Sequence, residues 1–255
     1  MKILLYNIAY GTGNPGGELK RVLSGHHFIL APERPFRKIR NFLTANRPDV
    51  ICLIEADIGS RRTGHVNQVQ SLAEHLGYRG FFRQKYAPLS LLRRLPYLRH
   101  QANAILSREE SVTEAIDFFP RGAKKLILTS RTGGITIVLV HLALGGKVRR
   151  SQLEYLAATL PVNEPLVVAG DFNTFGGAAE LEELLRATGL RSANRDHQPS
   201  YPAWAPFREL DYLLLSPQVR LTGFQMPRVF FSDHLPLIAE VELTESATAA
   251  HSSRK

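Results

Sequence analysis

The fold follows most directly from the stretch VVAGDFNTFGG, at residues 167–177. It contains an apolar run, a glycine, an acid and an amide two positions apart, and further glycines. The apolar run predicts a buried strand, and the glycines predict a turn directly after it. Loops at strand ends are where functional groups concentrate, because a rigid scaffold holds them. We therefore expect Asp171 and Asn173 to act on a ligand at the end of this strand.

The sequence on both sides of this stretch predicts a mixture of strands and helices. Runs rich in β-branched and aromatic residues predict strands over residues 2–11, 50–56, 102–107, 125–131, 134–144, 165–170, 210–216 and 235–243. Helical spacing of apolar residues predicts helices within the stretches 34–50, 66–78, 147–160 and 177–189. In the first of these stretches, Pro48 marks the end of the helix. Several strands follow one another directly, which favours antiparallel pairing. Two sheets with helices covering their outer faces would satisfy this order.

The composition is that of an ordinary globular protein, and a chain of this length can form two domains or one. The chain has 255 residues, of which 44% are apolar and 22% charged, as in ordinary globular proteins. We expect one domain over residues 1–243 and a disordered polar tail over 244–255. The single cysteine, Cys52, cannot form an internal disulfide. No signal peptide or membrane-spanning run is visible, so we expect a soluble, cytoplasmic protein.

The charge of the chain favours anionic partners. The formal net charge is +9, which suits nucleic acid, phosphorylated metabolites or lipid headgroups. Residues 79–108 contain no acid but carry seven basic residues: Arg79, Arg83, Lys85, Arg93, Arg94, Arg99 and Arg108. A solvated face and an anion-binding surface are both compatible with this basic segment.

Polar residues stand at the ends of several predicted strands. Each one alone is typical of a cap or a turn. Together they form a set: Asn7, Glu55, His141, Asp171, Asn173, Asp211, Asp233 and His234. We expect the strands to bring these side chains to one edge of the packed sheets.

The order of these motifs resembles the endonuclease/exonuclease/phosphatase superfamily, the relatives of DNase I. The resemblance runs from Lys2 to about Val241, and GDFN followed downstream by SDH is its most specific part. The matching motifs are YNI at 6–8, LIEAD at 53–57, NAILSR at 103–108, HL at 141–142, GDFNT at 170–174, LDYLLLS at 210–216 and SDHLP at 232–236. The resemblance implies a four-layer α/β sandwich of two mainly antiparallel sheets packed face to face, with helices on the outer faces.

The resemblance also implies metal ligands. Glu55 would be the main ligand, with Asn7 beside it, and Asp233 would hold the site through a neighbouring contact or bind the metal itself. Oxygen donors of this kind suit Mg²⁺, with Mn²⁺ as the alternative. Zinc is disfavoured because the sequence has no Cys/His cluster at ligand spacing.

The resemblance assigns the remaining residues to catalysis. Asp171 would orient or deprotonate the attacking water, and Asn173 would donate to the phosphate oxygens. His234 would bind a phosphoryl oxygen and His141 would contact the phosphate. Asp211 would orient a histidine, most plausibly His234, and so raise its pKa.

The expected activity is metal-dependent hydrolysis of phosphate esters, with a nuclease-like phosphodiesterase as the first hypothesis. A phosphatase or a sphingomyelinase-like enzyme acting on a small-molecule or lipid headgroup phosphate is the alternative. A non-catalytic binding module is a third hypothesis. The intact set of acids, amides and histidines argues against it, because such a module could have lost Glu55 or His234.

Overall fold

The computed structural model describes residues 1–13, 31–87, 90–96 and 98–244. The tail expected to be disordered lies, apart from Thr244, outside these residues. Within them, no helix combines the length and the apolar character needed to cross a membrane.

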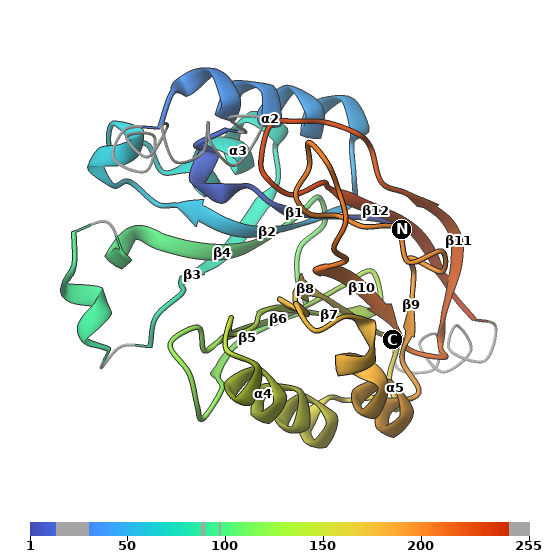
Figure 1. Cartoon of the computed structure of the whole chain (residues 1–255). Coiled ribbons are helices and arrows are strands. Elements are labelled where there is room, and N and C mark those ends of the chain that lie inside the picture. Colours follow the sequence, from blue (N-terminus) through green and yellow to red (C-terminus); the bar gives the residue numbers. More distant parts are fainter. Residues whose placement is uncertain (14–30, 88–89, 97, 245–255) are drawn as a thin grey trace.

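Two six-stranded sheets form the centre of the molecule (Figure 1). The first has the order β11-β12-β1-β2-β4-β3, with bounds β11 Val219–Gln225, β12 Leu237–Leu243, β1 Lys2–Asn7, β2 Val50–Asp57, β4 Gln101–Ser107 and β3 Arg79–Gln84. The second has the order β5-β6-β7-β8-β10-β9, with bounds β5 Thr113–Phe118, β6 Leu126–Thr132, β7 Ile135–His141, β8 Leu166–Asp171, β10 Asp211–Leu215 and β9 Arg191–Ser192. Each sheet is antiparallel apart from one parallel pair, β1 with β2 and β7 with β8.

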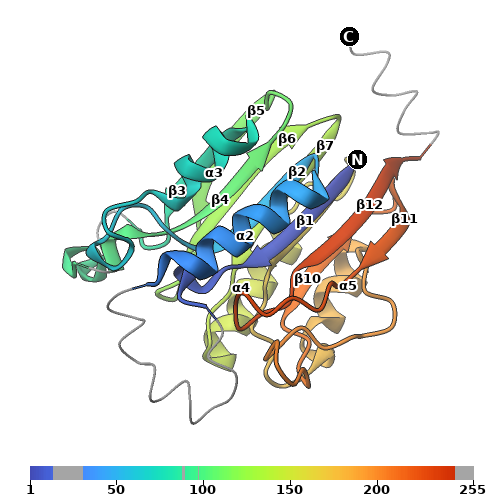
Figure 2. The same ribbon diagram turned by 90° about the horizontal axis from the view of Figure 1, so that it is seen from above.

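Helices cover the outer face of each sheet, which gives four layers (Figures 1 and 2). The α-helices are α2 Glu33–Asn46 and α3 Gln68–Leu76 on the first sheet, and α4 Gly146–Thr159 and α5 Glu182–Thr188 on the second. Short 3-10 helices are η1 Ala9–Gly11, η3 Arg61–Thr63, η4 Leu91–Arg94, η5 Leu98–His100 and η6 Ala178–Leu181. The expected four-layer sandwich is confirmed.

Helix ends follow the local sequence. Helix α2 ends before Arg47, which has the left-handed φ of 45° and precedes Pro48. Asn67 caps the start of α3 by accepting hydrogen bonds from two backbone N–H groups, and Gly77 ends it at a φ of 69°. The prediction of one helix over 177–189 is wrong for its first turn: residues 178–181 form the 3-10 helix η6, and α5 begins at Glu182.

The strands that the sequence did not predict are the outermost ones. Strands β3, β5, β9 and β11 lie at the four sheet edges, where side chains meet water on more than one side. Strand β5, for example, has the sequence TEAIDF and buries none of its residues fully. The run RVFF at residues 228–231 contains no strand, and β12 begins only at Leu237. Polar edge strands lack the apolar run that marks central strands.

Strand direction brings the polar strand ends together. The parallel strands β1, β2, β7 and β8 all finish at one edge of the sandwich, and the antiparallel strands β4, β10 and β12 begin there. His141 lies opposite Asp171 in the β7–β8 register. A Cβ atom on Gly170 would lie 2.5 Å from the carbonyl oxygen of Val140, so the glycine of GDFN permits the close approach of these two strands.

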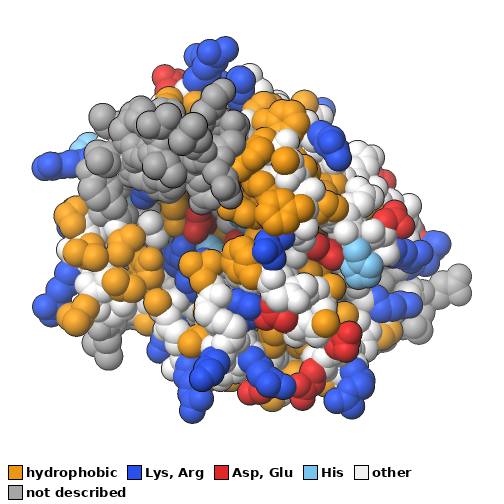
Figure 3. Space-filling model, in the orientation of Figure 1, with side chains coloured by type: hydrophobic (Ala, Val, Ile, Leu, Met, Phe, Trp, Pro, Cys, Tyr) orange, Lys and Arg blue, Asp and Glu red, His pale blue; other side chains and the backbone are white. Residues whose placement is uncertain are grey.

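On the face of the molecule shown in Figure 3, the kinds of side chain at the centre differ from those at the periphery. Basic side chains are spread around the periphery, whereas hydrophobic side chains gather around a hollow near the centre. Acidic, basic and histidine side chains are visible in that hollow.

Candidate active site

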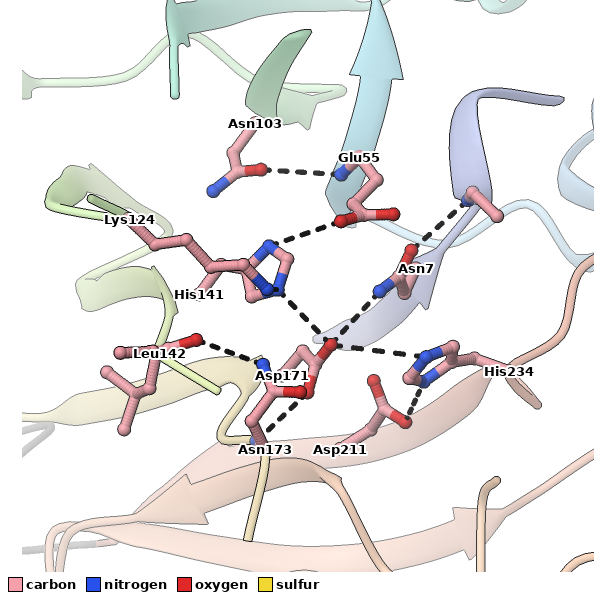
Figure 4. A network of polar contacts seen from close by, with 12 residues as sticks. Asn7, Glu55, Asn103, Lys124, His141, Leu142, Asp171, Asn173, Asp211 and His234 are labelled. Atoms are coloured by element: carbon pink, nitrogen blue, oxygen red, sulfur yellow. Dashed lines mark hydrogen bonds and ion pairs between the residues drawn. The ribbon is translucent and has the colours of Figure 1, made fainter. Parts of the chain in front are cut away.

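Asp171 occupies the centre of a polar network at the strand ends (Figure 4). Its Oδ1 accepts a hydrogen bond from the backbone N–H of Asn173 at 3.0 Å, and its Oδ2 accepts one from Asn7 Nδ2 at 3.1 Å. The Nε2 atoms of His141 and His234 lie 3.4 and 4.0 Å from the same Oδ2. Burial raises the pKa of Asp171 above its ordinary value, although the positive charge of His234 opposes the shift.

His234 is held from behind by Asp211. His234 Nδ1 donates to Asp211 Oδ2 at 2.7 Å, and Ser200 Oγ donates to the same oxygen at 2.7 Å. Burial alone would lower the pKa of His234, but the carboxylate of Asp211 outweighs it and the pKa rises to about 10. His234 is therefore a cation at neutral pH. The 4.0 Å between its Nε2 and Asp171 is too long for a hydrogen bond, so this N–H is available to a ligand.

His141, unlike His234, is uncharged. Burial lowers its pKa well below the ordinary value, and the ammonium group of Lys124 lowers it further. Lys124 Nζ is in hydrogen-bond contact with His141 Nε2. Burial and the charge of Lys85 also lower the pKa of Lys124, to about 8. His141 is neutral, and the imidazole nitrogen Nδ1 is buried without a hydrogen-bond partner among the described residues.

Glu55 forms the opposite wall of the network. Its Oε1 accepts a hydrogen bond from Lys85 Nζ at 2.9 Å and lies 4.0 Å from His141 Nδ1. Burial raises the pKa of Glu55, but the ammonium groups of Lys85 and Lys124 outweigh it and lower the pKa to about 2. The backbone of Glu55 has a φ of 56°, next to a bulge between Leu53 and Ala56 in the pairing of β2 with β4. Such a conformation costs about 1–3 kcal/mol and is characteristic of functional sites.

A second layer of contacts fixes Lys85. Its Nζ also donates to the hydroxyl of Tyr10 at 3.1 Å. The guanidinium of Arg62 lies 4.3 Å from the Tyr10 ring centroid, and Arg62 pairs with Asp57 at 3.1 Å in a fully buried contact. These contacts restrain the side chain of Lys85, so its ammonium group stays beside Glu55.

The two amides at the site are oriented by the backbone. Asn7 Oδ1 accepts from the N–H of Ala9 at 3.1 Å, which directs its Nδ2 to Asp171. Asn173 Nδ2 donates to the carbonyl oxygen of Leu142 at 2.9 Å, and the backbone of Asn173 has a φ of 51°. A side-chain amide nitrogen carries two hydrogens, so Asn173 retains one donor for a ligand.

The oxygen donors at the site fit a hard divalent cation. One oxygen of Glu55 is bound by Lys85, while the side chain is 20% exposed, so the carboxylate remains accessible. Asp171, Asp211 and His234 each offer an atom within 4.8 Å of the others, but the protonated His234 donates to Asp211 and cannot act as a metal ligand in that state. Asp211 Oδ1 is buried without a hydrogen-bond partner among the described residues. Carboxylate oxygens of this kind match Mg²⁺ and Mn²⁺.

The structure brings together seven of the eight residues selected from the sequence. The contacts given above connect Asn7, Glu55, His141, Asp171, Asn173, Asp211 and His234. The eighth, Asp233, accepts from Ser232 Oγ at 3.3 Å, and that hydroxyl also donates to the carbonyl of Asn7 at 2.7 Å. Asp233 therefore lies beside the network, and its charge contributes to the raised pKa of His234.

Three further residues belong to the site and were not selected from the sequence. Lys85 and Lys124 supply its buried ammonium groups, and Asn103 Oδ1 accepts from the backbone N–H of Glu55 at 3.3 Å. Lys85 lies in the acid-free stretch, and Asn103 lies in the NAILSR motif, so each had a weak signal. Lys124, in the sequence RGAKK, had none.

Comparison with known proteins agrees with this geometry. The sequence model of the endonuclease/exonuclease/phosphatase family matches residues 4–234. The chain belongs to this family. Endonucleases, exonucleases and phosphatases all cleave phosphate esters, so hydrolysis of a phosphoester is the general activity that membership supports. Among curated proteins, the chain is 28% identical over 229 residues to the uncharacterized protein YbhP of Escherichia coli strain K12, covering 81% of this chain and 88% of YbhP.

Solved structures of family members have the same fold. The endonuclease/exonuclease/phosphatase protein of Beutenbergia cavernae superposes with a TM-score of 0.73 at 20% identity, covering 95% of this chain and 71% of that one. The catalytic domain of human Nocturnin superposes with a TM-score of 0.67 at 20% identity, covering 96% and 93%. At this level of identity the superpositions establish the shared fold and leave the substrate open.

Proposed function

We propose that this protein is a divalent-metal-dependent phosphodiesterase of nuclease type. The observation that carries the proposal is the position of Asp171 between the neutral imidazole of His141 and the imidazolium of His234. A base with a raised pKa thus stands beside a cation that can bind a phosphate oxygen. Sites for acid–base catalysis typically hold protonated and unprotonated side chains next to each other, with pKa values shifted from their ordinary range.

Asp171 would accept the proton of the attacking water. Its raised pKa makes it a better base near neutral pH than an ordinary aspartate. The hydrogen bonds from Asn7 and from the backbone of Asn173 fix the carboxylate, so one orientation of the water is favoured. The water oxygen would attack phosphorus as the bond to the leaving-group oxygen breaks.

His234 and the free N–H of Asn173 would stabilise the charge that develops on the phosphoryl oxygens. His234 suits this role because Asp211 keeps it protonated and oriented. Positioned donors of this kind contribute most where water is excluded, and both side chains are buried. Lys124 adds an ammonium group on the side of Asp171 where His141 lies.

Glu55 would hold the metal together with Asn7, and Asp233 would support the site or bind the metal directly. When bound, Mg²⁺ or Mn²⁺ would polarise the phosphoryl group and neutralise charge on its oxygens.

The charge of the chain bears on the class of substrate. The net charge of +9 favours a polyanion, and neutralising phosphates dominates the affinity of proteins for nucleic acids. Within the basic segment 79–108, however, Lys85 is committed to Glu55, and Arg79 and Arg108 pair with Glu110 and Asp49. A phosphatase or sphingomyelinase-like activity on a small-molecule or lipid headgroup phosphate is therefore the second candidate.

A panel of substrates tests the proposal. Plasmid DNA, abasic DNA, single-stranded RNA, a generic phosphodiester, a phosphomonoester and sphingomyelin are each incubated with Mg²⁺, with Mn²⁺ or with EDTA. We expect cleavage of phosphodiesters that requires metal and is slowed about 10²–10⁴-fold in Asp171→Asn. Cleavage of sphingomyelin or the phosphomonoester alone would favour the second candidate, and full activity in EDTA would refute the metal requirement.

A further inference from the structure

Two phenylalanine rings and an arginine form an exposed rim beside the site. We call Phe175, Phe207 and Arg208 the aromatic rim. The guanidinium carbon of Arg208 lies 5.6 Å from the ring centroid of Phe175 and 5.2 Å from that of Phe207. Arg208 also donates to the carbonyl oxygen of Phe175 at 2.6 Å. Phe207 is 66% exposed and Phe175 is 38% exposed, so much of each ring faces water.

The backbone connects the aromatic rim to catalytic residues on two sides. The N–H of Phe175 donates to the carbonyl oxygen of Asn173 at 2.7 Å. The N–H of Phe207 donates to the carbonyl oxygen of Tyr201 at 3.0 Å, and the Tyr201 ring lies 4.8 Å from the ring of His234. The rim is therefore part of the loops that position the phosphate-binding groups.

Neither phenylalanine belongs to the hydrophobic cores of the molecule. Large apolar side chains are rarely left exposed in groups unless they bind something.

We propose that the aromatic rim binds an unpaired nucleobase of a substrate whose phosphate lies at the catalytic residues. The proposal rests on the proposed phosphoesterase function and names the substrate class as nucleotides or single-stranded nucleic acid. Bases stack on phenylalanine and arginine without regard to sequence, because every base has a flat π-face. An acyl chain suits this rim less well, because it would remove the charge of Arg208 from water without pairing it.

Equilibrium binding in EDTA tests the proposal without requiring turnover. A thymidine pentamer is compared with a pentamer of the same phosphodiester backbone that carries no bases, both labelled at one end and followed by fluorescence anisotropy. A second pair, adenosine monophosphate and ribose 5-phosphate, is compared by calorimetry. The first pair represents a nucleic-acid strand and the second a free nucleotide. In each pair the phosphate charge is the same and only the base differs.

The variants separate stacking from charge. Phe207→Ala removes the most exposed ring, and Arg208→Lys keeps the charge but removes the planar group. Val112→Ala is the matched control, because Val112 is 83% exposed and lies beside Arg131, at the end of β6 remote from His141. Thermal melting confirms that each variant is folded.

We expect Phe207→Ala to weaken binding of the base-carrying ligand in at least one pair by roughly 5- to 150-fold. Binding of the base-free partner should stay unchanged, and Val112→Ala should change neither. Equal losses on both members of each pair, or no loss on any, would overturn the proposal. Because binding is measured without hydrolysis, failure of the wild-type protein to cleave any phosphoester would count against the proposed function alone.

Discussion

Replacing Lys85 by methionine should destabilise the fold while strengthening metal binding. The ammonium group lies 2.9 Å from Glu55 Oε1, with 4% of the Lys85 side chain and 20% of the Glu55 side chain exposed. Removing one partner of a buried ion pair costs about 3–5 kcal/mol, because the remaining charge stays buried without compensation. Water reaches part of Glu55, so we expect a loss near the lower limit, about 3 kcal/mol at neutral pH.

The same change should raise the affinity for a divalent cation. At the dielectric constant of water, Coulomb's law gives about 1.7 kcal/mol of repulsion between an ammonium group and a divalent ion about 5 Å away. Loss of that repulsion corresponds to roughly a 10- to 20-fold lower Kd. A variant that loses stability but binds Mn²⁺ more tightly would show that Lys85 balances the charge of Glu55.

Two measurements check this prediction. Urea denaturation followed by the fluorescence of the single tryptophan, Trp204, gives the free energy of unfolding, and titration calorimetry gives the Kd of Mn²⁺. Lys147→Met, at an exposed position in α4, is the matched control. A loss of stability below about 1 kcal/mol, or weaker binding of Mn²⁺, would refute the reasoning.

The pH dependence of the destabilisation gives a further check on its cause. The pKa of Glu55 is lowered from 4.5 to about 2 in the folded protein. The ionised carboxylate therefore contributes stability above pH 4.5, and that contribution is lost as the pH falls towards 2. The difference between wild type and Lys85→Met should accordingly shrink over this range. A difference independent of pH would assign the loss to packing of the lysine stem.

Other predictions follow from the proposed roles. Asp171→Asn should fold, bind metal and lose about 10²–10⁴ in kcat. His234→Ala should lose about 10²–10³ in kcat. The double variant should lose less than the product of these two factors, because both residues act on one transition state. A loss of kcat in the double variant equal to the product of the two single losses would argue for independent roles. The raised pKa of Asp171 predicts that kcat falls on acidification at a pH above the 3.8 of an ordinary aspartate, and a flat pH–rate profile down to that value would contradict it. Glu55→Gln should weaken Mn²⁺ binding without unfolding the chain, which calorimetry and thermal melting together can decide. Replacing Arg93, Arg94 and Arg99 with glutamine should weaken binding to a polyanion and flatten its salt dependence. Unchanged binding would exclude the basic segment from the substrate site.

The sequence by itself determined the central strands and the principal residues of the site. Central strands such as β8 are buried on both faces, so they appear as continuous apolar runs. GDFN can be recognised in the sequence because a glycine, an acid and an amide directly follow an apolar run. These signals are local, and they are sufficient to identify the family.

The tertiary structure decided the edge strands, the buried lysines and the charges of the site. Strands β3, β5, β9 and β11 meet water at the sheet edges, so their sequences carry no apolar run. His141 and His234 have the same side chain, but His141 is neutral and His234 is a cation, because burial and the Lys124 ammonium lower the pKa of His141 whereas Asp211 raises that of His234. Burial and neighbouring charges set a pKa, and the neighbours come from distant parts of the chain: Lys85 is 30 residues from Glu55, and Asn7 is 164 residues from Asp171. Only the folded chain places them within a few ångströms of each other.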